Sequence, residues 1–199
     1  MKRRILLALG VAIASSVFAQ GTAPLTRLRG TIERADAKSV QVKTADGRVV
    51  TLGYADDFTV NEVVPVDPAA IQSGTFVGTT AVPGPDGSLS AVEVHVFPEE
   101  ARGTGEGHRP WDLQPGSTMT NATVTAIKPG ANDRTLTLRY KDGEKTIRVP
   151  NGVPIVTVKP SDRSLMIPGA KVIVTQQVRD GQAVATRAVV GRNGFAPPM

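Results

Sequence analysis

The stretch LTLRYKDGEKTIRV, residues 136–149, alternates apolar and polar side chains on both sides of a central Asp-Gly pair. Such a pair between two alternating runs indicates a β-hairpin closed by a two-residue turn. With Asp-Gly as the turn, Leu138 lies opposite Ile147 and Leu136 lies opposite Val149. The sequence therefore predicts a hairpin with one apolar face.

A related signal occurs in KTADGRVVTL, residues 43–52, which also holds an Asp-Gly pair between alternating runs. Here a three-residue loop is needed, because it sets Val42 opposite Val50 and Val40 opposite Leu52. A slip of one residue would turn every side chain to the other face. We expect the glycine of this loop to adopt the left-handed conformation.

Two further landmarks recur after the hairpins. IQSGTFV (71–77) matches MIPGAKV (166–172), and DGSLSAVEVHV (86–96) matches DGQAVATRAVV (180–190). With the hairpins, three landmarks recur in the same order at offsets of 96, 95 and 94 residues. A nearly constant offset is typical of an internal duplication. The chain therefore reads as a tandem repeat.

The two copies, roughly 28–97 and 121–192, each contain five short runs with strand character. The helical signal is limited to one turn, with Asp67 as its cap and Pro68 at its first position. Five short strands and a helical turn favour a small, partly open barrel of the oligonucleotide/oligosaccharide-binding (OB) type. A five-stranded sandwich is the alternative.

The predicted fold class is therefore all-β, with two tandem five-stranded OB-like barrels joined by an ordered linker rich in Gly and Pro. The expected boundaries are 1–19 for a signal peptide, 20–97 for the first barrel, 98–121 for the linker and 122–199 for the second barrel.

The first 19 residues have the pattern of a secretory signal peptide: three basic residues, a short apolar run and a small residue, Ala19, before the cleavage point. We expect a periplasmic or secreted protein with no transmembrane segment after signal cleavage. The chain contains no cysteine, so disulfides cannot supply stability and each domain must bury enough apolar surface by itself.

Charge argues against nucleic acid as a partner. The formal net charge is +5, but removal of the signal leaves 20 basic against 18 acidic side chains, a net charge of +2. Nucleic-acid-binding domains are expected to carry a dense basic face. Outside the signal the chain has seven aromatic residues, too few and too scattered for a base-stacking platform.

The pattern I-x-x-G-x-x-V…D-G-x-x-x-A-x-x-V runs through residues 71–94 and, more loosely, 166–188. It resembles a secreted bacterial domain-of-unknown-function family with small OB-like barrels. The stretch RGTGEGHRPWDLQPGSTMTNATV, residues 102–124, is similar to a tandem subgroup of that family. Relatives sometimes carry a metal ABC transporter permease label, which the lack of membrane spans here contradicts. The resemblance implies the fold and export, and no reaction.

Sequence motifs of enzymes are missing: there is no G-x-S-x-G, P-loop or H-E-x-x-H. No cofactor is predicted, and a divalent metal is the alternative. Its candidate ligands are the two histidines and nearby carboxylates, namely His95, His108, Glu99 and Glu106. On its strand His95 should face outward with Glu93, away from the valines. Their spacing matches no recognised zinc motif.

The stretch GTGEGHRPWD, residues 103–112, holds the one tryptophan of the chain, Trp111. A long linker without a predicted helix or strand is expected to be functional or disordered. An exposed indole is unsuited to a flexible linker. We expect Trp111 to pack into the seam between the barrels as a clasp. A ligand site in the same seam and a plain tether are the alternatives. The seam candidates are Arg102, Glu106, His108, Arg109, Trp111 and Asp112.

The halves differ in charge: residues 20–97 carry a net charge of −3 and residues 122–199 a net charge of +7. Arg139, Lys141 and Arg148 should share the outward face of the second hairpin. The positive charge of the second half predicts either attraction between the two barrels or contact of this face with an anionic envelope polymer or lipid surface.

The leading functional hypothesis is an exported, non-enzymatic binding or envelope-associated scaffold protein of unknown ligand. The alternative is a periplasmic metal-handling protein that uses His95, His108 and nearby carboxylates. An enzyme is the third hypothesis.

Overall fold

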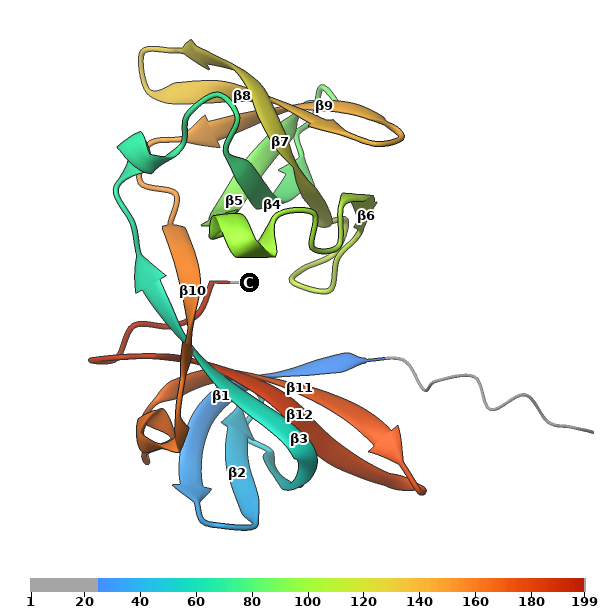
Figure 1. Cartoon of the computed structure of the whole chain (residues 1–199), viewed down its shortest axis with the longest axis vertical. Coiled ribbons are helices and arrows are strands. Elements are labelled where there is room, and N and C mark those ends of the chain that lie inside the picture. The colour runs from blue at the N-terminus through green and yellow to red at the C-terminus, as the bar shows by residue number, and fades with distance from the viewer. Residues whose placement is uncertain (1–24, 199) are drawn as a thin grey trace, which may run out of the picture.

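The computed structural model describes residues 25–198, so the predicted signal peptide lies outside the described residues. Strands dominate, and three single-turn helices join them: η1 (Pro68–Ala70), η2 (Glu99–Ala101) and η3 (Arg163–Leu165). No helix in this part of the chain is both long and apolar enough to cross a membrane. The prediction of an all-β fold is confirmed, and the strands form two lobes with a waist between them (Figure 1).

Five strands close into a barrel: β1 (Thr26–Ala35), β2 (Ser39–Thr44), β3 (Val49–Pro65), β11 (Lys171–Arg179) and β12 (Gln182–Gly191). The cyclic order is β1-β2-β3-β12-β11 and back to β1. All pairs are antiparallel except β3 with β12, which run parallel. Closure leaves this barrel without a free sheet edge.

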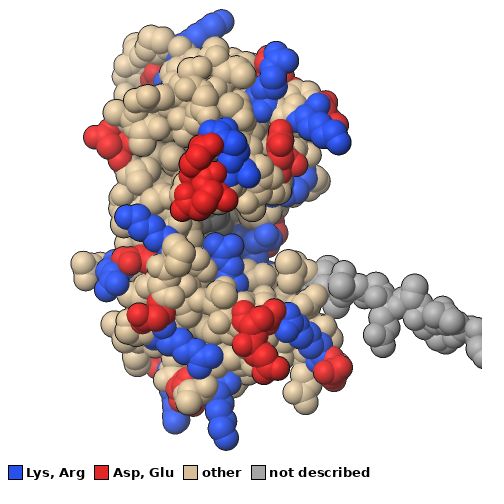
Figure 2. Space-filling model, in the orientation of Figure 1, with Lys and Arg blue, Asp and Glu red and all other residues tan. Residues whose placement is uncertain are grey.

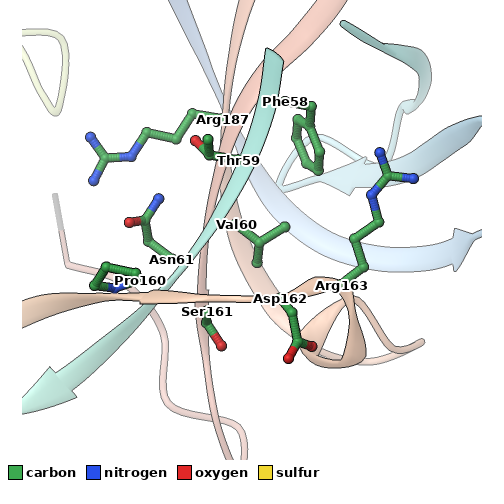
Figure 3. A pocket seen from close by; sticks show the side chains of 9 residues that line it. All are labelled: Phe58, Thr59, Val60, Asn61, Pro160, Ser161, Asp162, Arg163 and Arg187. Atoms are coloured by element: carbon green, nitrogen blue, oxygen red, sulfur yellow. The ribbon is translucent and has the colours of Figure 1, made fainter. Parts of the chain in front are cut away.

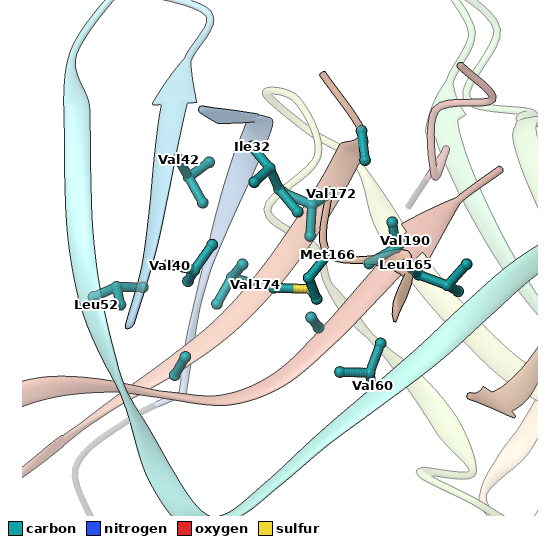
Figure 4. Close-up of a cluster of buried hydrophobic side chains, with 13 residues drawn as sticks. Ile32, Val40, Val42, Leu52, Val60, Leu165, Met166, Val172, Val174 and Val190 are labelled. Carbon is teal, nitrogen blue, oxygen red and sulfur yellow. The ribbon is translucent and has the colours of Figure 1, made fainter. Parts of the chain in front are cut away.

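The barrel core consists of inward-facing aliphatic side chains that alternate with polar ones along each strand. Val40 and Val42 of β2 and Val174 of β11 are fully buried, and Leu165 and Met166 cover one end (Figure 4). Alternation with period two places one face of each strand in the core. The core therefore joins side chains from both ends of the sequence.

A second group of five strands pairs around its own core: β4 (Phe76–Pro83), β5 (Leu89–Val96), β7 (Thr118–Pro129), β8 (Asp133–Tyr140) and β9 (Gly143–Pro150). The order β7-β8-β9-β5-β4 returns to β7, again with one parallel pair, β5 with β9. We call this group the β7 ring. Its core includes Val77, Leu136 and Ile147, which are fully buried.

Strands are exchanged between the two halves of the chain. The barrel combines β1–β3 of the first copy with β11 and β12 of the second, and the β7 ring combines β7–β9 of the second copy with β4 and β5 of the first. The predicted boundaries, 20–97 and 122–199, therefore do not separate the two cores. Local patterns cannot reveal this, because equivalent strands of the two copies carry the same alternation.

The long strand β3 explains how the chain crosses over. Its beginning pairs with β2 in the barrel, and its end pairs antiparallel with β10 (Ile155–Ser161) at the waist. β3 thus carries the chain from the barrel to β4, and β10 carries it back from β9. Figure 1 shows the two strands crossing between the lobes. Val63, Val156, Val158 and Val189 form a small third core there, against which Phe195 packs.

The first hairpin is confirmed in register: Val42 lies opposite Val50 and Val40 opposite Leu52. Gly47 adopts the expected left-handed conformation, with φ of 84°.

The second hairpin was predicted in the wrong register. Leu136 lies opposite Ile147, and the strands close at Tyr140 and Gly143 rather than around Asp142-Gly143. A Cβ on Gly143 would lie 3.3 Å from the Tyr140 hydroxyl, so the tyrosine covers the glycine. The shift of two residues preserves alternation, and the predicted apolar face is buried as expected.

The helical turn after β3 is confirmed: the Asp67 carboxylate accepts a hydrogen bond from the Ala69 amide, and Pro68 begins the turn. The segment between β5 and β7 has structure that the sequence did not predict. It contains η2 and a short strand, β6 (Gly107–Pro110), which pairs antiparallel with β7. The segment lies against the β7 ring on the side that faces the barrel (Figure 1).

Candidate functional site: a cavity at the waist

A cavity of about 480 Å³ lies at the waist, between the β7 ring, the segment that follows β5, and the barrel. We call it the waist cavity and define it by Arg27, His95, Arg109, Trp111, Asn121 and Arg187. Figure 2 shows a hollow between the lobes with basic side chains gathered along its lower rim. Its walls come from strands far apart in the sequence, which only the strand exchange brings together.

Apolar side chains form much of the wall. Phe97 and Met119 come from the β7-ring side, and Val158, Ile173 and Val189 come from the opposite side. An apolar wall with a few polar groups is the usual composition of a small-molecule site, and this volume is in the usual range.

Trp111 joins the segment after β5 to the barrel. The Arg27 guanidinium lies over the indole at 3.9 Å from the ring centre, and Arg109 lies 5.5 Å from it. Beside the indole, the Asp112 carboxylate pairs with Arg29 at 2.9 Å and with Arg27 at 3.5 Å. The seam candidates Arg109, Trp111 and Asp112 therefore meet β1 at the waist.

Three arginines contribute positive charge to the waist cavity, and they differ in their partners. Arg27 pairs with Asp112, and Arg109 donates to the Gly105 carbonyl at 2.7 Å. The Arg187 side chain has no hydrogen bond or ion pair among the described residues, 25–198. Burial lowers the pKa of the Arg187 guanidinium, and the charge of Arg27 lowers it further. Glu100 also lines the cavity, so its charged groups leave an excess of positive charge.

The Arg187 side chain is exposed to solvent, yet protein surrounds much of its guanidinium. Both are true of a guanidinium that reaches into a cavity. Figure 3 shows this side chain extended past Thr59, with its head group on the same side as the Asn61 amide.

Three residues that line the waist cavity each carry a buried polar atom without a hydrogen-bond partner within the part of the chain that the structure describes: His95 Nε2, Trp111 Nε1 and Asn121 Oδ1. Buried polar atoms are nearly always paired in native proteins, with protein groups or with bound molecules. Asn121 is oriented by its amide, which donates to the Thr104 carbonyl at 2.9 Å. Of these atoms, the indole Nε1 can only donate a hydrogen bond, Asn121 Oδ1 can only accept one, and His95 Nε2 does either according to its tautomer.

Gly78 allows this close arrangement on β4. A Cβ at Gly78 would lie 2.8 Å from Asn121 Oδ1 and 3.1 Å from the Phe97 ring. Any larger residue would displace one of these two side chains.

His95 was predicted to face outward, and its solvent exposure is lower than that prediction implied. Val94 points into the ring core and His95 to the other face, but the barrel and the segment after β5 cover that face. The imidazole is buried and stacks on Phe97 with 4.2 Å between ring centres. Burial, and then the Arg187 charge, lower the pKa of His95 to about 4. His95 is therefore neutral near pH 7.

Glu93 is a buried acid that sequence reasoning missed, since its place beside His95 resembled a solvent-facing position. The side chain is fully buried, and one carboxylate oxygen accepts a hydrogen bond from Thr80 at 3.0 Å. The other oxygen has no partner among the described residues. Burial raises the pKa of Glu93 to about 7, against the lowering effect of the Thr80 hydrogen bond.

The remaining seam candidates contact other groups. Arg102 pairs with Glu99 at 2.5 Å and also donates to the Gly74 carbonyl. Glu106 accepts a hydrogen bond from the Lys141 amide. His108 Nδ1 lies 2.8 Å from the Thr120 hydroxyl.

The metal candidates His95, His108, Glu99 and Glu106 are not brought together. Between residues 25 and 198 no three side chains of His, Cys, Asp or Glu form a group that could hold a metal ion.

Arg139, Lys141 and Arg148 are exposed, as predicted for the outward face of the second hairpin. Arg139 pairs with Glu144 at 3.1 Å, and Arg148 pairs with Asp133 at 3.4 Å. Neighbouring carboxylates thus offset part of the charge that this face presents.

No protein-family model, curated protein or solved structure matches this chain.

Proposed function

We propose that this chain is a non-enzymatic binding protein that holds a small anionic ligand in the waist cavity. Arg187 is the observation that carries the proposal, because its guanidinium reaches into the cavity without a carboxylate partner among the described residues. Arginine forms strong, often bidentate hydrogen bonds with carboxylate and phosphate groups. An anion at Arg187 would also relieve the repulsion between Arg187 and Arg27.

The apolar wall supports a ligand that is more than a bare ion. Phe97, Met119 and Ile173 line the same cavity as the arginines. Trp111 Nε1 would supply a hydrogen-bond donor, and Asn121 Oδ1 an acceptor. The arrangement favours an organic anion with an uncharged body that carries both donor and acceptor groups.

We also propose that the barrel and the β7 ring are both OB-like. Each has five strands in the same cyclic order, with one parallel pair closing it. The same proposal includes export to the periplasm or outside the cell and association with the envelope. It also includes membership of the secreted bacterial family that the sequence resembles.

Contact of Arg139, Lys141 and Arg148 with an anionic polymer or lipid surface is a separate and weaker proposal. Because two of these side chains already pair with carboxylates, an anion there must compete with existing ion pairs. Exposed pairs of this kind contribute little free energy.

The test uses benzoate, phenyl phosphate and inorganic phosphate as probes. Since Trp111 is the only tryptophan and lines the cavity, its fluorescence reports binding directly. We expect at least one organic anion to bind, and Arg187→Gln to weaken it about tenfold, the loss of one charge-assisted hydrogen bond. Titration calorimetry gives an independent affinity.

Arg48→Gln is the matched control, since Arg48 is an exposed arginine at the β2–β3 turn that pairs with Asp46. It should leave the affinity unchanged. Equal weakening by both variants would indicate general electrostatics instead of a site. Failure of all three anions to bind at millimolar concentration would contradict the proposal.

A further inference from the structure

A second hollow of about 610 Å³ adjoins the waist cavity, and the two share Asn61, Pro160 and Arg187 in their walls. We call it the side hollow; Figure 3 shows the side chains that line it. It is open to solvent and lies where β3 and β10 cross. Arg187 thus stands between two adjoining spaces.

The side hollow has a second arginine without a carboxylate partner in the described chain. Arg163 lies over Tyr54 at 4.2 Å and over Phe58 at 5.4 Å from the ring centres, and donates to the Ala37 carbonyl. These contacts hold its side chain in place without neutralising its charge. Arg163 and Arg187 both line the side hollow, and with the Asp162 carboxylate beside them they leave it an excess of positive charge.

Uncharged groups of the side hollow fit a hydroxyl-rich ligand. The Phe58 ring offers an apolar surface, while Thr59 and Ser161 offer hydroxyls and Asn61 an amide. The side chains of Thr59, Asn61 and Ser161 make no hydrogen bond to any other described residue. Phosphate chains lack an apolar surface, whereas a sugar ring has apolar C–H faces and many hydroxyls.

We propose that the ligand is a linear acidic oligosaccharide that occupies both cavities, with one carboxylate at Arg187 and the next at Arg163. This inference rests on the proposed function and names the class of its ligand. The first sugar unit lies in the waist cavity and the second over Phe58. Two linked units bind more tightly than one, because the second contact becomes intramolecular.

The test compares galacturonate with its linear α-1,4-linked trimer, using Trp111 fluorescence and calorimetry on the full chain. We expect the trimer to bind at least about tenfold more tightly than the monomer. Arg163→Gln should remove most of that gain and leave monomer binding unchanged. Arg187→Gln should weaken both ligands, and Arg48→Gln neither.

Arg163→Lys separates charge from folding, since it keeps the positive charge but loses the guanidinium plane over Tyr54 and Phe58. It should retain part of the trimer's gain. Melting temperatures of all variants establish that they fold.

The oligosaccharide inference would be overturned if the trimer bound no more tightly than the monomer, or if Arg163→Gln left the affinity for the trimer unchanged. Binding of benzoate or the monomer at Arg187 would in that case still support the proposed function. Tighter binding of linear polyphosphate than of the trimer would also overturn it, because the site would then recognise charge alone.

Discussion

The Arg27 guanidinium lies 3.9 Å above the Trp111 indole, and this contact ties the segment after β5 to the first strand of the barrel. The Asp112 carboxylate reinforces it by pairing with Arg29 and Arg27. The same contact closes one side of the waist cavity. The Trp111 side chain therefore contributes both to the stability of the waist and to the wall of the cavity.

Trp111→Ala should lower the melting temperature by about 4–8 °C. Losing a half-buried indole and its cation–π contacts should cost about 2 kcal/mol, less than for a fully buried tryptophan, and each kcal/mol shifts a domain of this size by about 2–4 °C. Circular dichroism is the measurement, since the variant lacks the fluorophore. Trp111→Phe should recover part of the loss. An unchanged melting curve for the alanine variant would mean that the segment does not act as a clasp.

Glu93 and His95 should give the stability of the protein opposite pH dependences. Burial raises the pKa of Glu93 to about 7, so the folded state binds an extra proton between about pH 4.5 and 7 and loses stability as the pH rises through 7. Burial lowers the pKa of His95 to about 4, so its contribution is present above pH 6.5 and is lost as the pH falls toward 4.

Glu93→Gln isolates the first effect. The variant should lack the loss of stability between about pH 4.5 and 7, and its advantage over the wild type should grow by about 2 kcal/mol from pH 5 to pH 8. Urea unfolding at several pH values measures this difference. Glu62→Gln is the control, because Glu62 is an acid at the waist whose carboxylate pairs with Arg192. Parallel pH profiles for the wild type and Glu93→Gln would show that Glu93 is not a buried titrating group.

Sequence reasoning succeeded where the information was local. The register around Val42 and Val50 and the cap at Asp67 follow from turn chemistry and alternation, and both are confirmed. It failed at the second hairpin because a shift of two residues leaves the apolar face intact. Alternation alone cannot distinguish those registers.

Part of the site was also predictable. Trp111 and Arg109 were expected in the seam from composition, and both line the waist cavity. Arg187 and Arg27 were missed, because each lies on a strand where a charged residue normally indicates a solvent-facing position. Only the strand exchange turns those positions toward the β7 ring, and no local signal records it.

The strand exchange itself predicts how the halves of the chain behave. Residues 20–97 alone supply β1–β5, three strands of the barrel and two of the β7 ring, and residues 98–199 supply the remainder. Neither half completes either core, so we expect each to be largely unfolded or self-associated when expressed alone. Mixed together they should form a 1:1 complex with the circular dichroism spectrum and melting behaviour of the intact chain. Size-exclusion chromatography with light scattering measures the stoichiometry. A half that folds as a stable, cooperatively melting monomer would show that its own strands close on themselves, and the exchanged arrangement would then be wrong.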